Sequence, residues 1–142
     1  MRTPREAGIF VYRDGRLLVL RRVEDAYWHT VAGVVEPHES FEEAAGRELR
    51  EEVGLDATLL DLDHPVLYPV TDELRRQYGY PPDVNTVTVR AFAAEAPPRW
   101  EPRLNEEHDI YRWCTVDEAV GLFHWPETRE AARILEKRLV RR

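Results

Sequence analysis

The chain has 142 residues, a length that suits one compact domain, and we expect residues 1–142 to form a single domain. Its formal net charge of −7 argues against a protein that binds nucleic acid through the phosphate backbone, because such binding requires a basic surface. The sequence has no apolar run of the roughly 18 residues that a membrane span needs, and its N-terminus lacks a signal-peptide core. With Cys114 as the only cysteine, no internal disulfide can form, and we expect a cytoplasmic protein without a membrane partner.

The N-terminal third is predicted to form extended segments followed by one helix. Apolar residues flank Asp14-Gly15 across 6–22, and this dipeptide favours a type I′ turn between two antiparallel strands. A third extended segment, 27–35, is rich in aromatic and β-branched residues. Ser40 and Glu43 have the spacing of a capping box that starts a helix, and Gly54 can end this helix in the left-handed conformation.

The rest of the chain is predicted to add strands before two closing helices. Strand material at 55–70 is broken near His64-Pro65, and 72–85 is expected to be a polar insertion with about one helical turn. Further strands are expected at 86–95 and 108–116, and helices at 116–123 and 126–142. Strands in the first two-thirds, with one acidic helix between them and another at the end, predict an α+β fold, arranged as an α/β/α sandwich.

The predicted first helix carries a cluster of like charges. The segment 33–55 contains seven glutamates and two arginines. At about 100° per residue, Glu48, Glu51 and Glu52 share one face of the helix, together with Phe41 and small residues that indicate partial burial. A solvated helix with ordinary i,i+4 ion pairs is the alternative interpretation. However, Glu48 and Glu52 are a like-charge i,i+4 pair, which is unfavourable even when exposed.

Partial burial would make this cluster costly unless a proton or a cation neutralises it. Two carboxylates roughly 6 Å apart at an effective dielectric near 20 repel by about 3 kcal/mol. Hard oxygen ligands favour Mg²⁺, which Mn²⁺ can replace, whereas the five histidines are scattered and show no zinc spacing. A divalent ion on a carboxylate face can bridge phosphate oxygens and activate water, so the cluster predicts metal-dependent phosphate chemistry.

The spacing in this segment resembles the Nudix box, GX5EX7REUXEEXGU. Gly33, Glu39 and the run REUXEEXGU from Arg47 to Leu55 match every specified position. The order of elements also resembles the Nudix fold, in which a mixed β-sheet is flanked by helices. This resemblance implies metal-dependent hydrolysis of a nucleoside diphosphate linked to another moiety.

The resemblance also implies roles for individual residues of the box. The expected metal ligands are three glutamates and a backbone carbonyl, namely Glu48, Glu51, Glu52 and Gly33. Arg47 is expected to orient a catalytic glutamate, Glu39 to brace the loop, and Gly54 to close the motif. The water-activating base is left open between Glu48 and Glu107, with Glu51 as a further catalytic candidate.

Within the family, the chain is most similar to dihydroneopterin triphosphate pyrophosphatases and related nucleoside triphosphate pyrophosphohydrolases, in 17–36 and 106–119. Those enzymes tend to keep one further catalytic glutamate, at the position that Glu107 has here. The resemblance therefore implies a small nucleotide-like substrate, most simply a nucleoside or pterin triphosphate that is cleaved with release of pyrophosphate.

Four residues outside the box are candidate substrate ligands, and alternatives are open for each. Arg21 and Arg22 are expected to clamp phosphate, or else to pair with nearby acids such as Glu24 or Asp25. Tyr78 and Tyr80 offer stacking surfaces for a ring. We assign Trp113 and Trp125 to packing.

Three other functions are alternatives to this hypothesis. An ADP-ribose or dinucleoside polyphosphate hydrolase is one, because Tyr68 and Pro69 loosely resemble features of those subfamilies. A non-catalytic Nudix module that only binds nucleotides is the second, although such a protein would be expected to lose glutamates of the box. The third is an acidic helix that serves as a protein interface. A homodimer is kept as a hypothesis for the assembly.

Overall fold

The computed structural model describes residues 2–140, which form one mixed eight-stranded sheet with helices on both faces. The strands are β1 (Arg5–Arg13), β2 (Arg16–Arg22), β3 (Trp28–His29), β4 (Val31–Val34), β5 (Leu59–Asp61), β6 (Val66–Pro69), β7 (Thr86–Glu95) and β8 (His108–Thr115). The helices are α1 (Phe41–Val53), α2 (Asp72–Tyr78), α3 (Val116–Leu122) and α4 (Pro126–Val140). The last two positions of the helix expected at 126–142 lie outside the described residues.

Strand β1 is the centre of the sheet. It runs parallel to β7 along most of its length and pairs antiparallel with β4 near its start and with β2 at its end. Beyond these neighbours, β8 extends the sheet from β2, and both β5 and β6 pair with β7. Asp14 and Gly15 both have positive φ, 52° and 74°, as a type I′ turn requires, so the predicted hairpin is confirmed.

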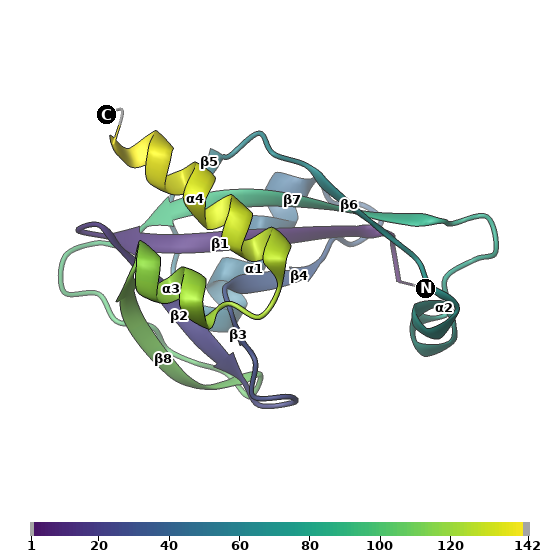
Figure 1. Cartoon of the computed structure of the whole chain (residues 1–142), viewed down its shortest axis with the longest axis horizontal. Helices are drawn as coiled ribbons and strands as arrows, with labels where there is room; N and C mark the ends of the chain where they lie inside the picture. Colours follow the sequence, from purple (N-terminus) through teal and green to yellow (C-terminus); the bar gives the residue numbers. More distant parts are fainter. Residues whose placement is uncertain (1, 141–142) are drawn as a thin grey trace.

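The two faces of the sheet carry separate hydrophobic cores, and this confirms the α/β/α arrangement. On β1, Ala7, Ile9 and Val11 belong to the core beneath α1, whereas Phe10 and Tyr12 alternate with them and belong to the core beneath α3 and α4. In Figure 1, α3 and α4 cover the near face of the sheet, α1 lies behind it, and α2 stands apart at one end.

Local sequence signals account for the bounds of α1. The Ser40 side chain accepts a hydrogen bond from the Glu43 amide, and the Glu43 side chain accepts one from the Ser40 amide. The helix ends at Gly54, which adopts the left-handed conformation at φ 75°. The capping box and the glycine cap are therefore both confirmed.

Two predicted segments differ from the structure in detail. The extended segment 27–35 is divided into β3 and β4 at Thr30, whose hydroxyl donates a hydrogen bond to the Ile9 carbonyl. The insertion at 72–85 contains the seven-residue helix α2 instead of one turn, because Thr71 caps its start and Gly79 its end. Within residues 2–140, no helix is both long and apolar enough to cross a bilayer.

Candidate active site

The last two turns of α1 place the clustered glutamates in different environments. Leu49 and Val53 anchor the helix in the core, and this orientation turns Glu52 inward until it is 1 % exposed. Glu48 lies at the edge of the buried side, with 12 % of its side chain exposed, whereas Glu51 is 56 % exposed. Glu48 and Glu52 thus occupy a buried face, and Glu51 borders it from the solvent side.

Arg47 connects the helix to the preceding loop. Its Nε and Nη2 donate to the two carboxylate oxygens of Glu39 at 2.8 Å each, and Nη2 also donates to the Val34 carbonyl at 3.1 Å. Its Nη1 donates to Oε1 of Glu48 at 2.8 Å and lies 3.4 Å from Glu51. The hydrogen bonds from Arg47 lower the pKa of Glu39 to about 2, so the ion pair between Arg47 and Glu39 stays charged at neutral pH. Arg47 therefore fixes the orientation of Glu48.

Gly33 in β4 makes room for the Glu48 carboxyl group. A Cβ atom built on Gly33 would overlap the Cδ, Oε1 and Cγ atoms of Glu48. Any other residue at this position would displace the glutamate, because β4 packs directly against α1. The glycine of the motif is thus explained by a close approach between strand and helix.

Glu107 reaches the same place from the loop before β8. The Asn105 side chain donates a hydrogen bond to the Glu51 carbonyl at 3.2 Å and accepts one from the Glu107 amide at 3.0 Å. These contacts connect this loop to the end of α1. The Val23 amide donates to the Glu107 carbonyl at 2.9 Å. Burial and the negative charge of Glu48 raise the pKa of Glu107 above its ordinary value.

His108 is a member of the site that sequence analysis did not single out. Ligand atoms of Glu52, Glu107 and His108 all lie within 4.8 Å of one another, and His108 Nδ1 is 3.8 Å from Oε1 of Glu52. The histidine is 7 % exposed, and burial lowers its pKa below the ordinary value, so it is neutral at pH 7. The view of the histidines as scattered is therefore corrected for His108, which the strand pairing brings beside Glu52.

The donor chemistry of this cluster suits a hard divalent cation. Oε2 of Glu52 and Nδ1 of His108 are both buried, and neither has a hydrogen-bond partner within residues 2–140. Burial and the neighbouring Glu48 raise the pKa of Glu52 far above its ordinary value. A buried carboxylate with an unpaired oxygen and two acidic neighbours either holds a proton or ligates a cation.

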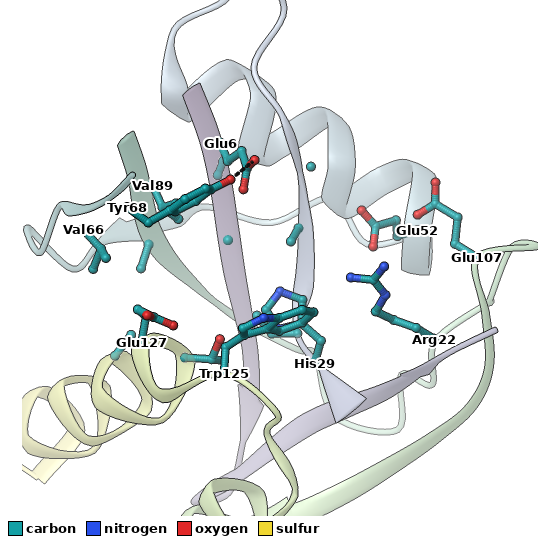
Figure 2. Close-up of a pocket in the computed structure, with 18 of the residues that line it drawn as sticks. Glu6, Arg22, His29, Glu52, Val66, Tyr68, Val89, Glu107, Trp125 and Glu127 are labelled. Atoms are coloured by element: carbon teal, nitrogen blue, oxygen red, sulfur yellow. Dashed lines mark hydrogen bonds between the residues drawn. The ribbon is translucent and has the colours of Figure 1, made fainter. Parts of the chain in front are cut away.

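The cluster lies at one end of a cleft of about 970 Å³, a volume typical of a small-molecule site. The cleft runs from Gly33, Glu52 and Glu107 over β1 to Tyr68 and the helix α2. Figure 2 shows Arg22 pointing toward Glu52 and Glu107, with Tyr68 at the far end of the cleft. The Arg22 guanidinium also lies 5.4 Å from the centre of the Trp125 ring.

The residues expected to bind substrate are distributed unevenly around this cleft. Arg22 lines it while pairing with Glu24 at 3.0 Å and Asp25 at 3.2 Å, whereas Arg21 lies outside the lining and pairs with Asp109 through two hydrogen bonds. The structure thus places Arg22, but not Arg21, in the lining of the cleft.

The aromatic candidates also differ in how they are placed around the cleft. Tyr78 lines the cleft and is 37 % exposed, but Tyr80 is 4 % exposed and its hydroxyl accepts a hydrogen bond from Arg2, so its ring offers no stacking surface. Trp125, which sequence analysis assigned to packing, lines the cleft beside His29, with 4.9 Å between ring centroids. Trp113 packs on the core beneath α1 as expected.

Fold and site together define the class of protein. The NUDIX domain family matches residues 2–137, and the chain belongs to this family. The dihydroneopterin triphosphate diphosphatase of Escherichia coli K12 is 32 % identical over 129 residues, which cover 87 % of this chain and 84 % of that protein. The solved structure of the E. coli dihydroneopterin triphosphate pyrophosphohydrolase has a TM-score of 0.80 and 29 % identity, covering 93 % of this chain and 94 % of that one.

A longer relative also contains a similar segment. The octanoyltransferase of Myxococcus xanthus is 36 % identical over 122 residues, which cover 84 % of this chain but 32 % of that protein. The chain thus spans about a third of the length of this relative.

Proposed function

We propose that this chain is a metal-dependent Nudix pyrophosphohydrolase that cleaves a nucleoside or pterin triphosphate and releases pyrophosphate. The observation that carries the proposal is the buried carboxylate of Glu52, which has an unpaired oxygen and lies beside Glu48 and Glu107 at the end of an open cleft. Similarity to the dihydroneopterin triphosphate diphosphatase of E. coli supports the choice of substrate class.

The metal in this proposal is Mg²⁺, which Mn²⁺ can replace. Its ligands would be carboxylates of Glu48, Glu51 and Glu52 with the Gly33 carbonyl, and Glu107 lies close enough to contribute. When bound, the ion would neutralise phosphate charge and lower the pKa of a coordinated water. Hard oxygen donors dominate this set, which favours these two ions over softer ones.

The chain's own residues would then orient the reactants and move the proton. Arg47 holds the Glu48 carboxylate in one orientation through Nη1, so this group is fixed before substrate arrives. Glu48 and Glu107 are the two candidates to accept the proton of the attacking water on a carboxylate oxygen. Arg22 lies in the cleft beside Glu107 and would counter the charge of the phosphates.

The test is hydrolysis by the purified chain with Mg²⁺, with Mn²⁺ and with EDTA. The panel contains dihydroneopterin triphosphate, the deoxynucleoside triphosphates, ADP-ribose and diadenosine tetraphosphate, and pyrophosphate and orthophosphate are measured separately. We expect metal-dependent release of pyrophosphate from triphosphates, and its loss in E52Q but not in E73Q, a matched exposed substitution on α2. Preferential cleavage of ADP-ribose or the dinucleotide would favour the alternative substrates, and turnover unchanged in E52Q would refute the catalytic site.

Three properties stay predictions from the sequence. They are the cytoplasmic location, the lack of a nucleic-acid partner and the homodimeric assembly. Light scattering of the purified chain measures the last of these directly.

A further inference from the structure

The end of the cleft away from Glu52 and Glu107 has a floor of small and apolar residues. Gly8 and Ala91 are paired neighbours on β1 and β7, and two positions along, Glu6 pairs with Val89. On β6, Val66 pairs with the same Val89. All five residues line the cleft, so the floor consists of small and branched apolar side chains with one carboxylate beside them. Gly8, without a side chain, leaves the middle of this floor open.

The carboxylate of Glu6 is held in place by two donors. The Tyr68 hydroxyl donates to Oε2 of Glu6 at 2.6 Å, and Nη2 of Arg2 donates to the same oxygen at 3.2 Å (Figure 2 shows the first contact). Arg2 is itself fixed, because its Nε donates to the Tyr80 hydroxyl at 3.0 Å and its guanidinium lies 4.0 Å from the centre of the Tyr78 ring. Burial and Glu6 raise the pKa of Tyr68, which keeps its hydroxyl protonated as a donor.

The second oxygen of Glu6 makes no such contact. Within the described part of the chain, no hydrogen bond or ion pair involves Oε1 of Glu6, although the side chain is only 22 % exposed. This oxygen is not fully buried, so it can accept hydrogen bonds from water in the free protein and from a ligand in the cleft. Here one oxygen is anchored, and the other is left to accept from whatever occupies the cleft.

We propose that Glu6 is a specificity-determining residue of a base subsite for rings that present adjacent N–H donors, as the 2-amino-4-oxopyrimidine edge of pterin and guanine does. A planar ring would lie on the floor formed by Gly8, Val89 and Ala91, with Tyr68 as the positioning residue that orients the carboxylate. This inference rests on the proposed function, since the base is the part of the substrate that lies away from the phosphates.

The chemistry of the acceptor explains which rings are selected. A guanine or pterin ring offers a ring N–H next to an exocyclic amino group, and both can point at a carboxylate. Adenine and cytosine place a ring nitrogen acceptor beside their amino group, so its lone pair would face the negative charge of Glu6. Thymine has one N–H between two carbonyl oxygens. A subsite built around a fixed carboxylate therefore discriminates by repulsion as well as attraction.

The test compares dGTP, dITP and dATP as substrates, because dITP differs from dGTP only by the exocyclic amino group. In the wild-type chain we expect kcat/KM for dGTP to exceed that for dITP and dATP by about 10-fold or more, as a lost hydrogen-bond donor implies. E6Q is expected to abolish most of this preference and Y68F part of it. E73Q, on the adjacent helix α2 but outside the cleft lining, is the matched control and should keep the wild-type ratios.

Ratios between substrates separate recognition from folding, because a variant that is merely unstable loses activity on all three nucleotides alike. If E6Q and Y68F both keep the wild-type dGTP:dITP ratio, the inference is wrong. The inference is also wrong if the wild-type chain cleaves dGTP and dATP equally well.

Binding without catalysis distinguishes failure of this inference from failure of the proposed function. Titration calorimetry with pterin or guanosine in EDTA needs neither metal nor hydrolysis. Glu6-dependent binding of these rings, with no turnover of any triphosphate, would reject the proposed hydrolysis and keep the base subsite. Metal-dependent turnover without Glu6-dependent binding would reject the base subsite and keep the proposed hydrolysis.

Discussion

Replacing Glu52 with glutamine should stabilise the metal-free protein while destroying its metal site. Glu52 is 1 % exposed, and burial together with Glu48 raises its pKa above neutrality. In the metal-free folded chain the group is therefore protonated at pH 7, whereas in the unfolded chain it is ionised. Glutamine has nearly the same shape and never carries the charge.

The size of the effect follows from the pH interval between the ordinary pKa of 4.5 and the pH of the experiment. Because the folded pKa is raised, the neutral Glu52 carboxyl makes its full favourable contribution to the free energy of unfolding below pH 4.5. This contribution is lost progressively above pH 4.5, as pH rises through the folded pKa. Each pH unit is worth about 1.4 kcal/mol, so at pH 7 the metal-free wild type is less stable by about 3 kcal/mol than it would be without this titration. Glutamine removes the penalty, which corresponds to roughly 10 °C in the melting temperature of such a domain.

The assay is thermal unfolding of wild type, E52Q and E51Q in EDTA and in Mg²⁺, at pH 5 and pH 7. In EDTA, we expect E52Q to exceed wild type at pH 7 and to approach it at pH 5. In EDTA, E51Q, an exposed substitution on the same helix, should stay within about 0.5 kcal/mol of wild type. Added Mg²⁺ should raise the melting temperature of wild type but not of E52Q, because only a bound ligand stabilises the folded state. An E52Q protein that is less stable than wild type in EDTA at pH 7 would refute this reasoning.

Three further substitutions test the surroundings of the cluster. G33A should leave the chain folded but lower kcat by about 100-fold, because the new methyl group displaces Glu48; a structure with Glu48 unmoved would contradict this. R47K should lower kcat and also the melting temperature, since lysine cannot form the two-pronged contact with Glu39, and R50K on the exposed side of α1 is its control. E107Q should remove one ionisation from the pH profile of kcat, at a pKa above the ordinary glutamate value; an unchanged profile would leave Glu48 as the base.

Features set by adjacent residues could be predicted from the sequence. The capping box of Ser40 and Glu43, the Gly54 cap and the Asp14-Gly15 turn each depend on backbone chemistry within a few positions. The helical period also placed the glutamates of α1 on a partly buried face. It could not say that Glu52 would be fully buried while Glu51 stayed exposed, because this difference depends on how α1 rotates against β4 and β1.

Features set by strand register could not be predicted in this way. His108 meets the site because β8 pairs with β2 and the register shifts between Arg21 and Arg22, opposite the start of β8. Glu6 and Tyr68 lie 62 positions apart and meet only because β1 and β6 both pair with β7. A single sequence gives no signal for such pairings.

The direct test of the central claim, that the buried acids of α1 hold a divalent cation, is titration calorimetry of the metal-free chain with Mn²⁺ and Mg²⁺ at neutral pH. The account predicts saturable binding by wild type and by E6Q, and loss of this binding in E52Q. No binding to the folded wild-type protein, or equal binding to E52Q, would contradict it.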